Sequence, residues 1–165
     1  MSKPRTSITP YQHSSERGFT LVELMVTLSI AAILMTMAVP SFTTITQNSR
    51  LTTQANQFVA AMNLARSEAV KRNAAINVTA NGGNWTTGWT VTVAADGTEV
   101  RRFEALAGDS TLTSAGGVAS FQYQASGRVS AADILNLCDG RTGETGRKIT
   151  IVTTGHVATT NLGCS

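Results

Sequence analysis

The sequence predicts an α+β fold in which one long N-terminal helix packs on an antiparallel β-sheet. Two observations support this fold: apolar residues recur at helical spacing as far as residue 73, and they alternate with polar residues after it. A length of 165 residues suits one modest domain. The hydrophobic content of 42% excludes a disordered chain, and the formal charge of +3 comes without a long run of like charges.

The chain opens with a basic segment followed by an apolar one. Residues 1–18 are polar and carry a net charge of +2, from Lys3, Arg5, Arg17 and Glu16. In the next 21 residues, Phe19 to Val39, 16 are hydrophobic and one, Glu23, is charged. At about 1.5 Å per residue this stretch spans roughly 30 Å, the thickness of a bilayer core. Basic residues ahead of the span predict a cytoplasmic N-terminus and export of the remainder.

Glu23 is unusual because a carboxylate in an apolar span costs roughly 2.5–3.5 kcal/mol on insertion scales. One interpretation is that its side chain reaches the lipid headgroups, since it lies only four residues into the span. The other is that it has a partner of opposite charge.

Residues 17–23 favour the second interpretation, because they resemble the type IV prepilin processing motif. The matching residues are Gly18, Phe19, Thr20, Leu21 and Glu23, with Pro40 at the family's usual place further along. The resemblance implies that a prepilin peptidase/methyltransferase removes the leader 1–18 and N-methylates Phe19. It also implies that Phe19, Glu23 and Pro40 serve assembly, with Glu23 pairing with the new α-amino group of a neighbouring subunit in the filament core.

The helical pattern continues beyond the apolar span. Apolar residues follow at steps of four, three, four, three and four, at Leu51, Ala55, Phe58, Met62, Ala65 and Ala69. The opposite face is expected to carry Arg50, Gln54, Arg66 and Lys71. The stripe is predicted to be core against the following sheet, with a coiled-coil contact as the alternative. One helix from Phe19 to about Asn73 is expected, kinked or loosened at Pro40.

This helix consists of a filament-core half, 19–40, and an amphipathic half, 41–73. Residues 64–73 resemble the corresponding helix of the GspH/FimT/FimU group of minor pilins and pseudopilins. An exported sheet domain, 74–165, is expected to follow, because the apolar period changes to two. The expected strands are Ile76 to Thr79, Trp89 to Val93, Val100 to Leu106, Val118 to Gln124, Ile134 to Cys138, Lys148 to Thr153 and Val157 to Thr160.

Two cysteines, Cys138 and Cys164, lie in the exported part, where oxidation is expected. A disulfide between them would fasten the chain end to the sheet, and two free thiols are the alternative. No catalytic constellation, metal site or cofactor site is predicted, because the histidines are isolated and the acids scattered. The sequence therefore indicates a protein that is not an enzyme.

A basic cluster near the C-terminal end raises the question of DNA binding. Arg141, Arg147 and Lys148, with Arg128, would contact phosphates if they lay together, and solvated loops are the alternative. FimT-like pilins implicated in DNA uptake carry a C-terminal Gly-Arg-x-Arg pattern, but here the comparable turn, 155–158, lacks both arginines. DNA is therefore a partner that the sequence admits and does not favour.

Together, these resemblances imply a minor pilin of a type IV pilus that acts in assembly near the filament tip. Its partners would be other major and minor pilins. It would first lie in the inner membrane as a single-pass protein with a periplasmic C-terminal domain, and then in the filament at the cell surface. A GspH-like pseudopilin of type II secretion and a DNA-binding FimT-like pilin are the alternatives.

Overall fold

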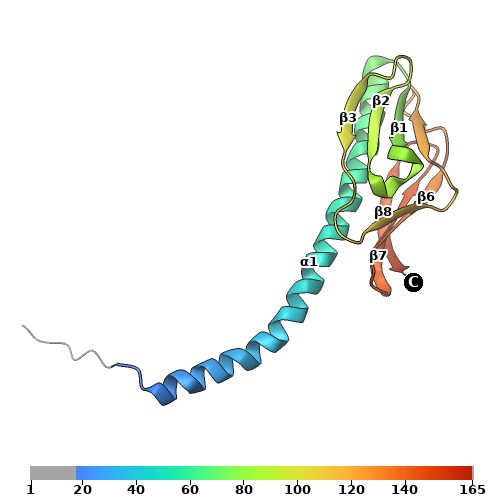
Figure 1. The fold of residues 1–165 in the computed structure, drawn as a ribbon. Coiled ribbons are helices and arrows are strands. Elements are labelled where there is room, and N and C mark those ends of the chain that lie inside the picture. Colours follow the sequence, from blue (N-terminus) through green and yellow to red (C-terminus); the bar gives the residue numbers. More distant parts are fainter. Residues whose placement is uncertain (1–17, 165) are drawn as a thin grey trace, which may run out of the picture. The chain divides into compact units, whose positions relative to one another are not determined.

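The computed structural model describes residues 18–164 (Figure 1). The expectations for the leader, residues 1–17, therefore lie outside the described residues. The chain divides after Phe42 into two compact units, each of which is described separately. One α-helix, α1 (Leu21–Arg72), contributes to both units.

The N-terminal end of α1 is capped by the side chain of Thr20. The Thr20 hydroxyl accepts a hydrogen bond from the Glu23 backbone N–H, at 3.2 Å, and the Thr20 carbonyl accepts one from Leu24, at 3.1 Å. Threonine followed three residues later by glutamate is a capping-box sequence, and the acid at this position complements the helix dipole. The helix therefore begins immediately after Thr20.

In the first unit, α1 is apolar, and all of its residues whose burial is described are exposed. An 18-residue window has a mean hydropathy of 2.1 and none of it is buried, so by length and composition this stretch is able to cross a membrane. Helical backbone continues through Pro40. The proline therefore does not end α1.

The C-terminal end of α1 is closed by a Schellman motif at Asn73. This residue has a positive φ of 50°, its N–H donates to the carbonyl of Val70, and the Ala74 N–H donates to the carbonyl of Ala69. Asparagine tolerates this left-handed conformation better than most residues. The predicted stop at Asn73 is confirmed.

The second unit contains two four-stranded antiparallel sheets. The first has the order β3-β2-β1-β5, built from β1 (Ile76–Ala80), β2 (Trp89–Val93), β3 (Glu99–Phe103) and β5 (Ser120–Tyr123). The second has the order β4-β6-β7-β8, built from β4 (Thr111–Ser114), β6 (Asp133–Cys138), β7 (Gly143–Ile151) and β8 (Val157–Cys164). Two short 3-10 helices, η1 (Asn81–Gly83) and η2 (Trp85–Thr87), lie between β1 and β2.

The core of the second unit forms where the C-terminal part of α1 packs against the sheets. All six residues of the predicted stripe are buried, with at most 2% of their surface exposed. Phe58 makes edge contacts with the rings of Trp85 and Trp89, at centroid distances of 5.3 and 5.2 Å. The prediction that the stripe is core is confirmed, and the α+β architecture with it.

Several strand boundaries differ from expectation, and β8 extends to Cys164 instead of ending at Thr160. β4 was not predicted, because Thr111–Ser114 has only one apolar residue, Leu112, and its assignment depends on pairing with β6. β3 ends earlier than predicted, at Phe103. β7 starts earlier, at Gly143, in a stretch whose glycines disfavour a strand, because β8 pairs with it from Gly143 to Ile151 with an irregularity between Gly143 and Gly146.

Candidate functional site

The junction between Gly18 and Phe19 lies directly ahead of the capped helix. Both residues are exposed and outside any regular element, and 78% of the Phe19 surface is accessible. A Cβ built on Gly18 would meet no atom within 4 Å. The fold itself therefore does not require glycine here, so a requirement for glycine would have to come from whatever recognises this junction.

Glu23 lies on the first turn of α1 and is exposed. Its backbone N–H is used by the Thr20 cap, but within residues 18–164 no hydrogen bond or ion pair is recorded for its carboxylate. The side chain is thus available to a partner from another molecule. Whether Phe19, Glu23 and Pro40 act in assembly remains a prediction.

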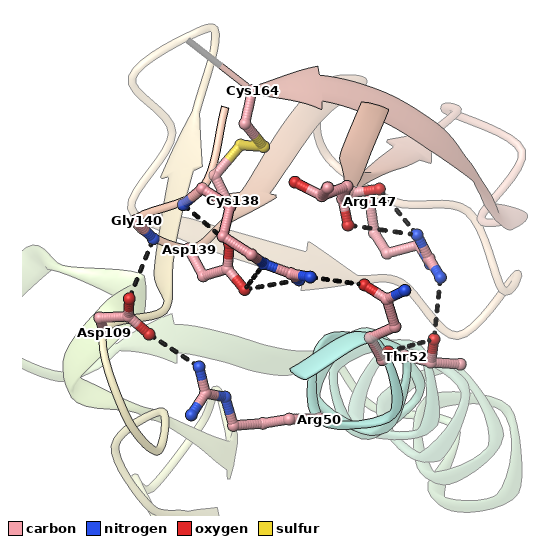
Figure 2. A network of polar contacts seen from close by, with 12 residues as sticks. Arg50, Thr52, Asp109, Cys138, Asp139, Gly140, Arg147 and Cys164 are labelled. Atoms are coloured by element: carbon pink, nitrogen blue, oxygen red, sulfur yellow. Dashed lines mark hydrogen bonds and ion pairs between the residues drawn. A yellow bond between two sulfur atoms is a disulfide. The ribbon is translucent and has the colours of Figure 1, made fainter. Parts of the chain in front are cut away.

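In the second unit, α1 holds two loops through polar side chains (Figure 2). Arg50 forms an ion pair with Asp109, with 2.7 Å between the guanidinium and the carboxylate. The other carboxylate oxygen of Asp109 accepts a hydrogen bond from the Gly140 backbone N–H, at 3.1 Å. One turn further along α1, Gln54 donates to the carbonyl of Ala107 at 3.0 Å. Gln54 is buried, so its predicted place on the polar face is wrong.

Arg141 belongs to the same network. Its guanidinium donates to both carboxylate oxygens of Asp139, at 2.8–3.0 Å, and to the Asn48 side chain on α1, at 2.9 Å. The hydrogen bonds from Arg141 hold the pKa of the Asp139 carboxyl below its usual range. Arg141 therefore fixes the loop after β6 to the helix.

Arg147 is held in the same way from the neighbouring strand. It donates to the carbonyl of Gly146 at 2.9 Å and to the hydroxyl of Thr52 on α1 at 3.0 Å. The Thr52 hydroxyl in turn donates to the Asn48 carbonyl at 2.9 Å. Asn48, Arg50, Thr52 and Gln54 thus each anchor a loop or strand.

The four basic residues considered for DNA do not gather on one surface. Arg141 and Arg147 both donate to α1, near Asn48 and Thr52. Lys148 follows Arg147 on a strand and therefore points to the opposite face of the sheet. Arg128 follows Gly127, which lies against Arg66 on α1. Arg66 is 18 helical residues, or about 27 Å, from Asn48, so Arg128 lies near a different part of the helix from Arg141 and Arg147.

Cys138 and Cys164 form a disulfide, so that prediction is confirmed. The bridge, visible in Figure 2, joins the ends of β6 and β8. These strands lie on either side of β7, and the two sulfurs lie against Gly146 of that strand. A Cβ built on Gly146 would lie 2.7 Å from the carbonyl oxygen of Leu137 and 3.1 Å from the sulfur of Cys138. Glycine is required here by close approach, not by backbone conformation.

Acid should destabilise the protein through the Asp139–Arg141 pair. Because the folded-state pKa of Asp139 is lowered, the pair's contribution is present above the unfolded pKa of about 3.9 and is lost as pH falls through the folded pKa. We expect Arg141→Gln to lower the unfolding free energy near pH 7 by about 1–2 kcal/mol, and by less in acid, where the Asp139 carboxyl is protonated. Chemical denaturation from pH 2 to 7 measures this. Arg128→Gln, at an exposed turn residue, is the control, and equal losses at both pH extremes would contradict the expectation.

The residues of this network were not recognisable from the sequence. Polar residues at every second helical position follow neither a core stripe nor a ligand motif, and their partners lie more than 50 residues away. Among the described residues no group of three or more potential metal ligands occurs.

Two family models match the chain. The model described as type II transport protein GspH matches residues 54–155, and the model of the prokaryotic N-terminal methylation motif matches residues 13–39. The search of curated protein sequences gave no match.

Solved structures share the fold. The type IV minor pilin FimU of Pseudomonas aeruginosa superposes with a TM-score of 0.62 at 23% identity, covering 69% of this chain and 90% of FimU. The minor pseudopilin EpsH from the type 2 secretion system of Vibrio cholerae superposes with a TM-score of 0.54 at 16% identity, covering 68% of this chain and 97% of EpsH. At these identities the likeness establishes the fold.

Proposed function

Because this chain belongs to the GspH family, we propose that it is a minor subunit of a type IV pilus, built into the filament near its tip. The observation that carries the proposal is the pairing of an N-terminal methylation motif with an exposed apolar helix that leads into a pilin-like domain. In this proposal the leader is removed after Gly18, Phe19 is methylated, and α1 moves from the inner membrane into the filament.

The apolar half of α1 supports this role on physical grounds. The large apolar side chains described in this half are exposed, so they need either lipid or other apolar helices around them. A helix that is first anchored in the membrane and then packed among the apolar helices of other subunits meets this need in both states. The filament's remaining subunits, major and minor pilins, would supply those helices.

The family also includes the alternative role of a minor pseudopilin in type II secretion, for which the likeness to EpsH is the supporting observation. Both roles use the same N-terminal helix. DNA binding has no such support, because Arg141 and Arg147 are engaged with α1. We therefore do not propose it.

Deletion of the gene separates the two roles. We expect deletion to reduce surface pili and twitching at least tenfold and to leave exoprotein secretion unchanged. Expression of the full-length chain should restore pili and twitching to normal. Pilus counts, twitching zones and secreted-protein assays are the measurements. Loss of secretion with normal twitching would instead assign the chain to type II secretion, and no change in either would contradict the proposal.

A further inference from the structure

The two sheets have four edge strands, and three of these are protected against pairing with another chain. β3 carries charged side chains, at Glu99, Arg101 and Arg102, and its register with β2 is irregular. β4 has four residues and its Leu112 N–H donates to the Thr86 hydroxyl. β5 also has four residues, and Ser130 bonds to the backbone of Gln122 in both directions. Charge, shortness and covering are the usual ways of blocking an edge.

β8 lacks charge, shortness and covering, and its register with β7 is regular from Val157 to Leu162, with a shift between Leu162 and Cys164. It contains eight residues, none of them charged or proline, and it lies at the end of its sheet beside β7. Residues 158–161 are exposed on both faces of the strand. Within residues 18–164 no hydrogen bond from its outer edge to another element is recorded. An unpaired edge of this length is a template for an additional strand.

The closing turn of the β7–β8 hairpin shows which backbone groups face outward. The Val152 N–H donates to the His156 carbonyl, and the Gly155 N–H donates to the Val152 carbonyl, so Val152 and His156 form a hydrogen-bonded pair. Hydrogen-bonded and non-hydrogen-bonded pairs alternate along antiparallel strands. The backbone groups of Ala158 and Thr160 therefore bond to β7. The N–H and C=O groups of Val157, Thr159 and Asn161 point outward from the free edge, in the plane of the sheet.

We propose that the free edge of β8 is an interaction surface that receives an extended, uncharged strand of a different pilin-class subunit. This inference rests on the proposed function. Backbone groups would supply the affinity, and small or β-branched side chains would match the alanine and threonines of β8. A partner strand rich in charge would lose the solvation of its charges without finding counter-charges on β8.

A second copy of this chain is a less suitable partner. Two β8 strands would pair antiparallel around a twofold axis perpendicular to the sheet. Such a pair would reverse the direction of residues 43–72 of one copy relative to those of the other, within the second unit alone. In the proposed filament all subunits run in the same direction, so a second copy suits the edge less well than a different subunit.

The test uses the full-length chain in cells that display the filament. A photoreactive benzoylphenylalanine replaces Thr160, next to the free edge, and adducts formed in ultraviolet light are identified by mass spectrometry. We expect an adduct with a strand of another pilin-class subunit. Thr159→Pro, which removes an outward N–H, should lower the adduct yield roughly tenfold, whereas Thr159→Ala should leave it unchanged.

As a control, the folding of each variant is checked by alkylating the cysteines without reductant, since only a chain that lacks the disulfide reacts. If Thr159→Pro exposes them, Asn161→Pro, which removes the next outward N–H, takes its place. Thr160→Pro removes an N–H that bonds β7 and should damage the hairpin itself. Equal yields for the Pro and Ala variants, an adduct only with a second copy, or no adduct would each overturn the proposal.

The experiments distinguish an error in the β8 proposal from an error in the proposed function. If deletion reduces pili and twitching but Thr159→Pro restores both and crosslinks normally, the chain is a pilus subunit and only the β8 proposal is wrong. If deletion changes neither pili nor twitching, the proposed function is wrong, whatever the crosslinks show.

Discussion

Replacing Gly146 with alanine is expected to destabilise the sheet domain by about 2–4 kcal/mol, because the new methyl group would occupy the space beneath the disulfide. Its Cβ would approach both the Leu137 carbonyl oxygen and the sulfurs of Cys138 and Cys164. Either β7 must move away from β6, or the bridge must open. The measurements are the unfolding free energy of the detergent-solubilised chain and its alkylation without reductant.

Gly163→Ala is the matched control for this prediction. Gly163 lies in β8 of the same sheet, but a Cβ there would meet only the Gly143 carbonyl oxygen, at an ordinary 3.9 Å. This variant should stay within about 1 kcal/mol of the natural protein. If the two glycine variants unfolded alike, the close approach at Gly146 would not be limiting. A double-mutant cycle with Cys138→Ser and Cys164→Ser separates the part due to sulfur from the part due to Leu137.

Glu23→Ala is expected to give a processed, membrane-anchored chain that fails to enter filaments, with incorporation reduced at least tenfold. In the proposed processing, cleavage after Gly18 would create an α-amino cation at Phe19, and an unpaired cation among apolar helices costs several kcal/mol. Immunoblots of sheared filaments and of membranes measure incorporation and anchoring. Glu23→Gln should fail similarly, because it keeps the shape but removes the charge.

Gly18→Ala gives a different defect and serves as the comparison. It should leave an uncut precursor of higher mass in the membrane, although nothing in the fold opposes a methyl group at that position. Normal incorporation of Glu23→Ala would show that Glu23 has no pairing role. Normal cleavage of Gly18→Ala would contradict the assignment of the junction.

Features determined by short-range pattern were predictable from the sequence. The stripe from Leu51 to Ala69 follows from helical spacing, and the stop at Asn73 from the preference of asparagine for a left-handed conformation. The N-terminal methylation motif, which a family model matches over residues 13–39, was recognisable because its residues are contiguous. In each case every determining residue lies within about one helical turn of the next one along the chain.

The polar network between α1 and the loops was not predictable. Asn48, Arg50, Thr52 and Gln54 find partners that only the tertiary fold brings to them. The same contacts remove Arg141 and Arg147 from the basic cluster that the sequence had suggested. β4 was also not predicted, because its four residues form a strand only by pairing with β6, which is distant in the sequence. Long-range pairing overrides local propensity at such positions.

The disulfide also has a consequence for the order of folding. It joins residues 26 apart, and the three strands that it spans, β6, β7 and β8, are consecutive along the chain and pair as neighbours. Contacts of such short sequence separation form fast, because little chain entropy is lost in closing them. We expect this three-strand meander to assemble and oxidise early after export, before the first sheet, whose β1–β5 pairing must close a loop of about 40 residues. The last part of the chain to leave the cytoplasm would then be the first to become stable.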